Sequence, residues 1–265
     1  MLDHRVFVRA TLGSYVAGHF LTLLPDAAEI FSSDGMLAHG SASPLMRAFP
    51  NVLALSDGPA VVVSLVGLGL VAGLCLAFGA RDRIAAGVAL YVTACLFGRN
   101  PLIANPAMPY VGLLLFSWAA QPKADGGRAW SPAVFRALWI AMAVGYTYSG
   151  LTKLAAPSWV GGEALAAVLD NPLARGGMLR TWALDLPPLL LRCCTWSVLG
   201  LEIAFAPLAL SSRARPWVWA AMLAMHVGLL VLIDFADLTL GMVTLHLAVL
   251  DPAWLRRWPR GRSDL

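Results

Sequence analysis

Long apolar segments, separated by short arginine-containing turns, restrict the folds available to this chain more than any other feature. A helix that crosses a bilayer needs about 20 predominantly apolar residues. Eight segments approach this length, the fourth being the shortest: residues 6–24, 59–79, 84–103, 108–121, 133–155, 189–210, 216–233 and 236–254. We therefore predict an all-α fold, a polytopic integral membrane helical bundle of about eight transmembrane helices, forming a single domain over residues 1–265.

Composition and charge agree with a membrane protein. Only 13% of the residues are charged and 59% are apolar, whereas a soluble domain has about 25% charged and about 45–50% apolar residues. This composition excludes a disordered or collagen-like chain. Most of the 19 lysine and arginine residues lie in short segments on one side of the predicted membrane, so both termini are expected to be cytoplasmic. We expect a multi-pass protein of the bacterial inner membrane, with the lipid bilayer as a partner and no nucleic-acid partner.

Two long segments fall on the opposite, outer side of the predicted membrane. Residues 25–58 contain turn signals around an expected short amphipathic helix near 44–56, and residues 156–188 are rich in proline and glycine. Since long loops carry function more often than short connections do, we expect a site that opens to this side.

Three ionisable residues within apolar segments are the candidate catalytic residues: Lys153, Glu202 and His226. A charge inside a membrane helix is costly, so each such residue is a functional candidate. Lys153 is one of only two lysines in a chain that otherwise uses arginine. A lysine, unlike an arginine, can lose its proton when buried and then act as a base. The alternatives are a Lys153 side chain that snorkels to the interface, a helix–helix contact at Glu202 and a packing role for His226.

Other polar residues are candidates for substrate binding. His19 on the first segment lies at a depth similar to that of Lys153, and Tyr146 shares a helical face with Lys153. Arg99 and Asn100 stand in a proline-broken turn at the outer face. They either line the same cavity or cap the ends of helices.

Metal binding is not expected. His246 lies deeper, toward the cytoplasmic side, and we interpret it as structural. The histidines and glutamates lack the HxxxH or ExxH spacing of helical metal sites. The four cysteines show no CxxC spacing, and we interpret them as buried, inert thiols, the alternative being a redox-active pair of Cys193 and Cys194.

The residues around Lys153 resemble a known family signature. The chain carries Tyr146-x-Tyr148-Ser149-Gly150-Leu151-x-Lys153-Leu154, followed by Trp159 and Gly162. This run is similar to the Y-x-x-A-G-x-x-K-L…W-x-x-G signature of HTTM-domain proteins, the membrane domain of the vitamin K-dependent gamma-carboxylase family. Further motifs of that family occur in the family's order: Asp34-Gly35, Arg99-Asn100-Pro101-Leu102-Ile103, Glu202, His226 and Asp251-Pro252-x-Trp254.

The resemblance implies a pocket open to the lumenal or periplasmic side, with Trp159 among the binding residues. It also implies that Lys153 is the base that deprotonates a reduced quinone, a vitamin K-type hydroquinone. Two departures argue against carboxylation of protein glutamate. The chain ends soon after Trp254, so we expect a short, bacterial-type member without the lumenal C-terminal domain, and Pro106 follows Asn105 where the carboxylases have a histidine.

The sequence is compatible with three functions. The first is an enzyme that acts on a quinol or another lipophilic substrate, with Lys153 as general base and Glu202 and His226 tuning or relaying the proton. The second is a non-catalytic accessory protein for the maturation or export of a small peptide, which would make a peptide its partner. The third is a lipid-binding or transport protein, against which the chain shows no internal repeat.

Overall fold

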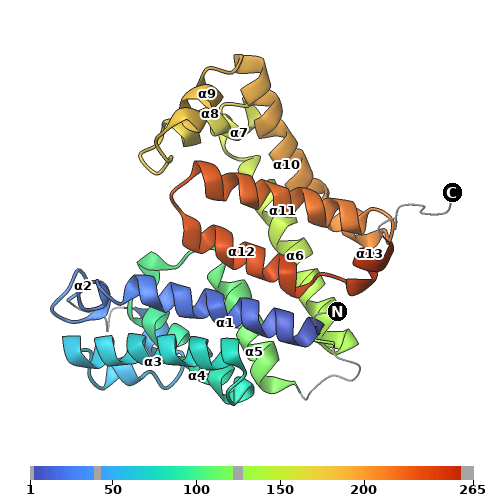
Figure 1. Ribbon diagram of the computed structural model, residues 1–265. Helices are drawn as coiled ribbons and strands as arrows, with labels where there is room; N and C mark the ends of the chain where they lie inside the picture. The colour runs from blue at the N-terminus through green and yellow to red at the C-terminus, as the bar shows by residue number, and fades with distance from the viewer. Residues whose placement is uncertain (1–2, 39–42, 122–127, 258–265) are drawn as a thin grey trace. The chain divides into compact units, whose positions relative to one another are not determined.

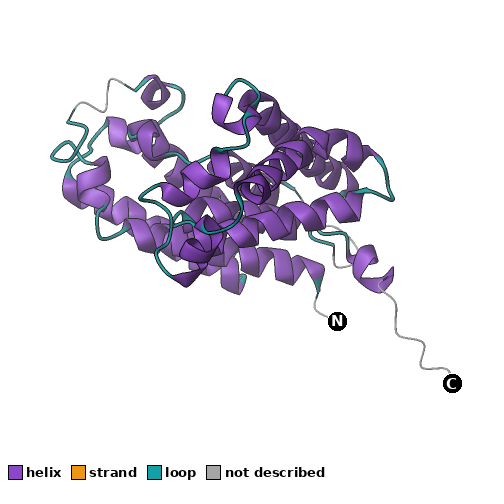
Figure 2. Cartoon of the chain, turned by 90° about the horizontal axis from the view of Figure 1, so that it is seen from above, coloured by secondary structure: helices purple, strands orange, loops and turns teal. Residues whose placement is uncertain are grey.

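The computed structural model describes residues 3–38, 43–121 and 128–257, and the chain divides into two compact units. Met1–Val134 form the first unit and Phe135–Leu265 the second. Within the described residues the only pairing of extended backbone is an isolated bridge between Ala174 and Ile233, and Figure 2 shows helices and loops throughout. The predicted all-α class is confirmed.

The first unit is built mainly from four longer helices (Figure 1). Its elements are α1 (His4–Leu23), α2 (Ala27–Phe31), η2 (Pro44–Arg47), η3 (Val52–Ala54), α3 (Pro59–Phe78), α4 (Asp82–Arg99), η4 (Pro101–Ile103) and α5 (Met108–Ala120). Small residues let α1 and α3 approach closely. A Cβ at Gly73 would lie 2.5 Å from the amide nitrogen of Ala17, and one at Gly69 would lie 2.7 Å from the ring of Phe20.

The second unit contains nearly all of α6 and the remaining helices. These are α6 (Pro132–Lys153), α7 (Pro157–Val160), α8 (Ala164–Asp170), α9 (Met178–Leu184), α10 (Pro188–Leu210), α11 (Arg215–Leu232), α12 (Ala236–Ala248) and α13 (Pro252–Arg257). A small apolar cluster of Leu169, Ala183 and Leu191 packs the short helices α8 and α9 against the start of α10. The long segment 156–188 is therefore folded into short helices.

Each of the eight predicted segments contains a helix, but the helices differ in their capacity to span a membrane. Among the described residues, α3, α10 and α11 are long and apolar enough to cross one. The apolar helices α5 and α12 have 13 residues each, which corresponds to about 20 Å and is shorter than the hydrocarbon core of about 30 Å. The count of eight transmembrane helices thus stays a prediction.

Two expected helices are wrong in detail. The single amphipathic helix near 44–56 is replaced by the separate turns η2 and η3. Pro50 disfavours helical backbone at the residue before it, and the Asn51 side chain accepts a hydrogen bond from the amide of Leu53, which starts a new turn. The last segment, expected to continue to residue 254, is interrupted after Ala248 and resumes as α13 at Pro252.

Candidate functional site

An ion pair between Lys153 and Glu202 forms the centre of the candidate site in the second unit. The Nζ atom of Lys153, at the end of α6, lies 2.5 Å from each carboxylate oxygen of Glu202, which projects from the middle of α10. The Glu202 side chain is 6% exposed and the Lys153 side chain is 23% exposed. A small molecule can therefore approach the pair only at the Lys153 side chain, because Glu202 is buried and both of its carboxylate oxygens contact the ammonium group.

A proline in α10 explains why α10 meets α6 at this point. Pro207 has no amide hydrogen, so the carbonyl of Ile203 loses its helical partner. The Thr147 hydroxyl of α6 lies 3.3 Å from the Glu202 carbonyl and 3.4 Å from the Ile203 carbonyl, and it accepts a 3.0 Å hydrogen bond from the Ala206 amide. The Thr147 hydroxyl thus supplies a donor near the carbonyl that the proline leaves free, and it joins the two helices beside Glu202.

Gly150 allows the backbones of α6 and α10 to approach each other. A Cβ at this position would lie 2.7 Å from the Ile203 amide nitrogen and 3.0 Å from the Glu202 Cβ. Any larger residue would push the helices apart and lengthen the contact between Lys153 and Glu202.

We predict that Gly150→Ala lowers the unfolding free energy by about 1–3 kcal/mol, because the added methyl group overpacks the contact between α6 and α10. Gly200→Ala in α10 is the matched control, since a Cβ there meets nothing within 4 Å. Alanine should stabilise that helix by up to about 1 kcal/mol. Unfolding of the purified variants in mixed detergent micelles, followed by tryptophan fluorescence, measures both effects. Equal shifts in the two variants would contradict the close approach.

Trp159 and Ser149 complete the surroundings of the ion pair. The Trp159 ring centroid lies 4.4 Å from Lys153 Nζ, a distance typical of a cation–π contact. The Ser149 hydroxyl donates a 3.3 Å hydrogen bond to Oε2 of Glu202. The structure therefore brings three of the predicted residues together: Lys153, Glu202 and Trp159.

His226 belongs to a second polar cluster, with Tyr146 and His246. The Tyr146 hydroxyl lies 2.6 Å from Nε2 of His226 and 3.5 Å from Nε2 of His246. Nδ1 of His246 lies 2.9 Å from the carbonyl oxygen of Met242. All three side chains are buried. His226 thus contacts Tyr146, which shares a face of α6 with Lys153 about 10 Å further along the helix axis.

His246, which we interpreted from the sequence as a structural residue, also belongs to this cluster. It is fully buried in α12, and its ring lies within 5.6 Å, centroid to centroid, of the rings of both Tyr146 and His226. The signal was present in the sequence, since an imidazole in an apolar helix is costly unless it is bonded. No three His, Cys, Asp or Glu side chains among the described residues are grouped so that they could hold a metal ion.

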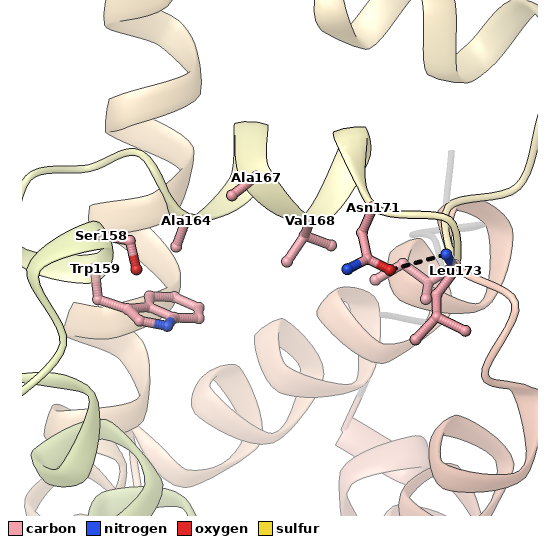
Figure 3. A pocket seen from close by; sticks show the side chains of 8 residues that line it. Ser158, Trp159, Ala164, Ala167, Val168, Asn171 and Leu173 are labelled. Carbon is pink, nitrogen blue, oxygen red and sulfur yellow. Dashed lines mark hydrogen bonds between the residues drawn. The ribbon is translucent and has the colours of Figure 1, made fainter.

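Trp159 also lines a pocket with a volume of about 360 Å³ (Figure 3). Its lining is mostly apolar and comes from α7, α8 and the segments that follow α8 and α11: Ser158, Trp159, Ala164, Ala167, Val168, Asn171, Leu173 and Ile233. Asn171 accepts a 2.9 Å hydrogen bond from the Leu173 amide through its side-chain oxygen. Trp159 therefore contacts the Lys153 ammonium and also lines an apolar pocket.

Arg99 lies in the first unit, where it anchors the long segment 25–58. The side chain is fully buried, and its Nε donates a 2.9 Å hydrogen bond to Asp57. Its Nη2 donates to the carbonyls of Ser32, at 3.0 Å, and Leu37, at 2.5 Å. Through these contacts Arg99 stabilises the fold of the first unit. That it also lines a substrate cavity stays a prediction.

Asn100 and His19 also lie in the first unit. The Asn100 side chain donates to the Ile30 carbonyl at 2.8 Å and accepts from the Leu102 amide at 3.1 Å, so it caps η4 and holds α2. His19 is half-buried on α1, with its ring 5.3 Å from that of Phe20. Their predicted roles in substrate binding remain predictions as well.

No family model, curated protein or solved structure matches this chain. The features of this chain that bear on function are the geometry of the Lys153–Glu202 pair, the buried histidines and the pocket beside Trp159. The resemblance to HTTM-domain proteins stays a prediction.

Proposed function

We propose that this chain is a multi-pass protein of a cell membrane, of the HTTM type, with both termini in the cytoplasm. Three helices long and apolar enough to span a membrane support this proposal, as does the concentration of basic residues in the turns on one side. In such a protein α5 and α12 would be too short to cross alone, and they would pair with neighbouring segments or with a locally thinned bilayer.

Within that membrane domain, the proposed activity is proton removal from a lipophilic hydroxyl compound, such as a reduced quinone, at the Lys153–Glu202 pair. The observation that carries this proposal is the position of the ion pair, which is buried on the glutamate side and open on the lysine side, next to a pocket walled by Trp159. The pocket volume of about 360 Å³ lies within the range of about 300–1,000 Å³ that small-molecule sites occupy, and its apolar lining suits a flat, lipophilic ring.

The pair supplies the chemistry of a general base. Lys153 passes one proton to Glu202, whose two oxygens both face Nζ, and the neutral amine then takes the proton of the substrate hydroxyl. The products are a protonated Glu202, a Lys153 ammonium and a substrate oxyanion. The ammonium stabilises that oxyanion where water is scarce, and Trp159 keeps the cation in place through its ring face.

A second candidate function is favoured by the same pocket. A protein that binds or carries a lipophilic molecule without reaction needs an apolar pocket and no base. Binding without turnover in the unmodified protein would support this alternative, whereas turnover that depends on Lys153 would support the enzyme.

Quinol turnover in purified variants tests the proposed activity. We expect Lys153→Ala and Lys153→Arg to lower the rate of oxygen-dependent quinol consumption at least about 100-fold, with menaquinol or vitamin K quinol as substrate. Arginine retains the charge but does not give up its proton, so it cannot act as the base. Lys123→Arg, the same change at the only other lysine, is the control and should leave the rate unchanged. Unchanged turnover in both Lys153 variants would show that the base is assigned wrongly.

A further inference from the structure

The polar groups that line the pocket beside Trp159 are mainly hydrogen-bond donors. They are the Ser158 hydroxyl, the Trp159 indole N–H and the Asn171 carboxamide. The indole and the carboxamide nitrogen only donate, whereas the hydroxyl donates or accepts. Among the described residues no lysine, arginine, aspartate or glutamate lines the pocket. Such a lining favours a neutral ligand that brings acceptor oxygens.

The carboxamide of Asn171 is oriented by the backbone of its own turn. Its Oδ1 atom lies 2.9 Å from the amide nitrogen of Leu173. Because an amide N–H only donates, the oxygen must face Leu173 and the Nδ2 atom must face the other way. Figure 3 shows this nitrogen on the side of Val168, toward the middle of the pocket. It makes no hydrogen bond to another group in the described part of the chain, so its N–H donors are offered to a ligand.

One face of α8 forms the pocket wall and leads to Asn171. The lining residues of this face stand at positions i, i+3, i+4 and i+7: Ala164, Ala167, Val168 and Asn171. That spacing places them on one side of a helix. Figure 3 shows Trp159 near the start of this face and Asn171 at its far end. The wall between these two donors is therefore apolar.

Contacts outside the pocket hold its walls in place. Leu169, which does not line the pocket, packs α8 against Leu191 of α10. Beyond Asn171, the Leu173 carbonyl accepts a 2.7 Å hydrogen bond from the Asp234 amide, which fastens the turn to the end of α11. The donor at Asn171 is thus in position before a ligand binds, which lowers the entropic cost of binding.

We infer that this pocket binds a neutral, lipophilic ring compound with carbonyl oxygens, and that Asn171 determines this specificity by donating a hydrogen bond to one of them. A hydrocarbon of the same shape would displace water from Nδ2 and give it no new partner, so the pocket disfavours it. The inference rests on the part of the proposed function that places a lipophilic ring in this pocket. It does not depend on Lys153 as a base.

Two compounds with the same ring test the inference: duroquinone, which has two carbonyl oxygens, and durene, which has none. Cys193 and Cys194, which were expected to be buried, are exposed. Duroquinone is methylated at every free ring position, so it does not add to these thiols. Calorimetric titration of the full-length protein in mixed detergent micelles gives the affinity for each compound. Ala167→Phe fills the pocket from an exposed position and supplies the baseline for partition into the micelle.

We expect the unmodified protein to bind duroquinone more tightly than durene. Asn171→Leu should lower this ratio of affinities about 2- to 10-fold, because one hydrogen bond to the ligand is lost. Asn171→Asp should lower the ratio further, since its carboxylate still accepts from the Leu173 amide but presents an oxygen instead of a donor to the carbonyl group. The affinity of Asn171→Leu for durene should be nearly unchanged.

An equal ratio in the unmodified protein and both Asn171 variants would overturn the inference. Absence of duroquinone binding above the Ala167→Phe baseline would overturn it as well. Neither result depends on turnover, because duroquinone has no hydroxyl proton for Lys153 to remove. Turnover that requires Lys153, together with an unchanged ratio, would refute the role of Asn171 and leave the proposed activity standing. A ratio that falls in the Asn171 variants, with turnover independent of Lys153, would support that role in a binding protein without the base.

Discussion

Lys153→Met should lower the unfolding free energy by about 3–5 kcal/mol, because it leaves the Glu202 carboxylate buried without a cation. The Glu202 side chain is only 6% exposed, and after the substitution its remaining side-chain partner is the Ser149 hydroxyl. A single neutral hydroxyl cannot replace an ammonium group that contacts both carboxylate oxygens. Unfolding of the purified variant in mixed micelles measures the loss.

The double variant Lys153→Met/Glu202→Leu is the matched control for this effect. It removes both charges and fills the space with apolar groups, so most of the lost stability should return. Glu202→Leu alone should cost less than Lys153→Met, because the Lys153 side chain is 23% exposed and its ammonium can reach a polar environment. A double variant as unstable as Lys153→Met would show that the loss comes from packing rather than from the unpaired charge.

Arg99→Met should destabilise the first unit by a similar amount, about 3–5 kcal/mol, and should expose the segment 25–58 to proteases. The fully buried guanidinium bonds Asp57 and the carbonyls of Ser32 and Leu37. Methionine fills part of the space but donates no hydrogen bond, so a carboxylate and two carbonyls lose their donor. Unfolding and limited proteolysis with mapping of the cleavage sites measure the two consequences.

Arg47→Met is the control for Arg99→Met. Arg47 lies in the same long segment, at the end of η2, and is exposed. Its replacement removes the same charge without breaking a buried network, and should change stability by no more than about 0.5 kcal/mol. If both variants unfold alike and are cleaved alike, Arg99 does not anchor the segment.

The elements of the fold were predictable from the sequence because apolar length and helical periodicity are local properties. All eight predicted segments contain helices, and the residues that interrupt the expected helices are also visible in the sequence. Pro50 and Asn51 divide the segment 44–56, and Pro252 starts a new helix after α12. The predicted helix ends are wrong there because an apolar run shows where burial is favourable but does not show where backbone hydrogen bonding stops.

The site was predictable as a set of residues but not as a set of contacts. Lys153 and Glu202 were expected together, and their pairing depends on the junction made by Thr147, Gly150 and Pro207. Residues 49 positions apart in the sequence meet there because a proline frees a carbonyl in one helix and a threonine in another supplies the donor. His246 was set aside for the same reason, since its partners lie on two other helices.

The helical class, the approximate extent of the apolar segments and the identity of the costly polar residues within them all follow from the amino-acid sequence. Those properties follow from the chemistry of each residue and its near neighbours. Three contacts depend on how the helices pack. Lys153 binds Glu202 and faces Trp159, His226 bonds Tyr146 beside His246, and Arg99 binds the segment 25–58. A buried polar group must find its partner on another helix, and helix packing selects that partner, so a local sequence pattern cannot show it.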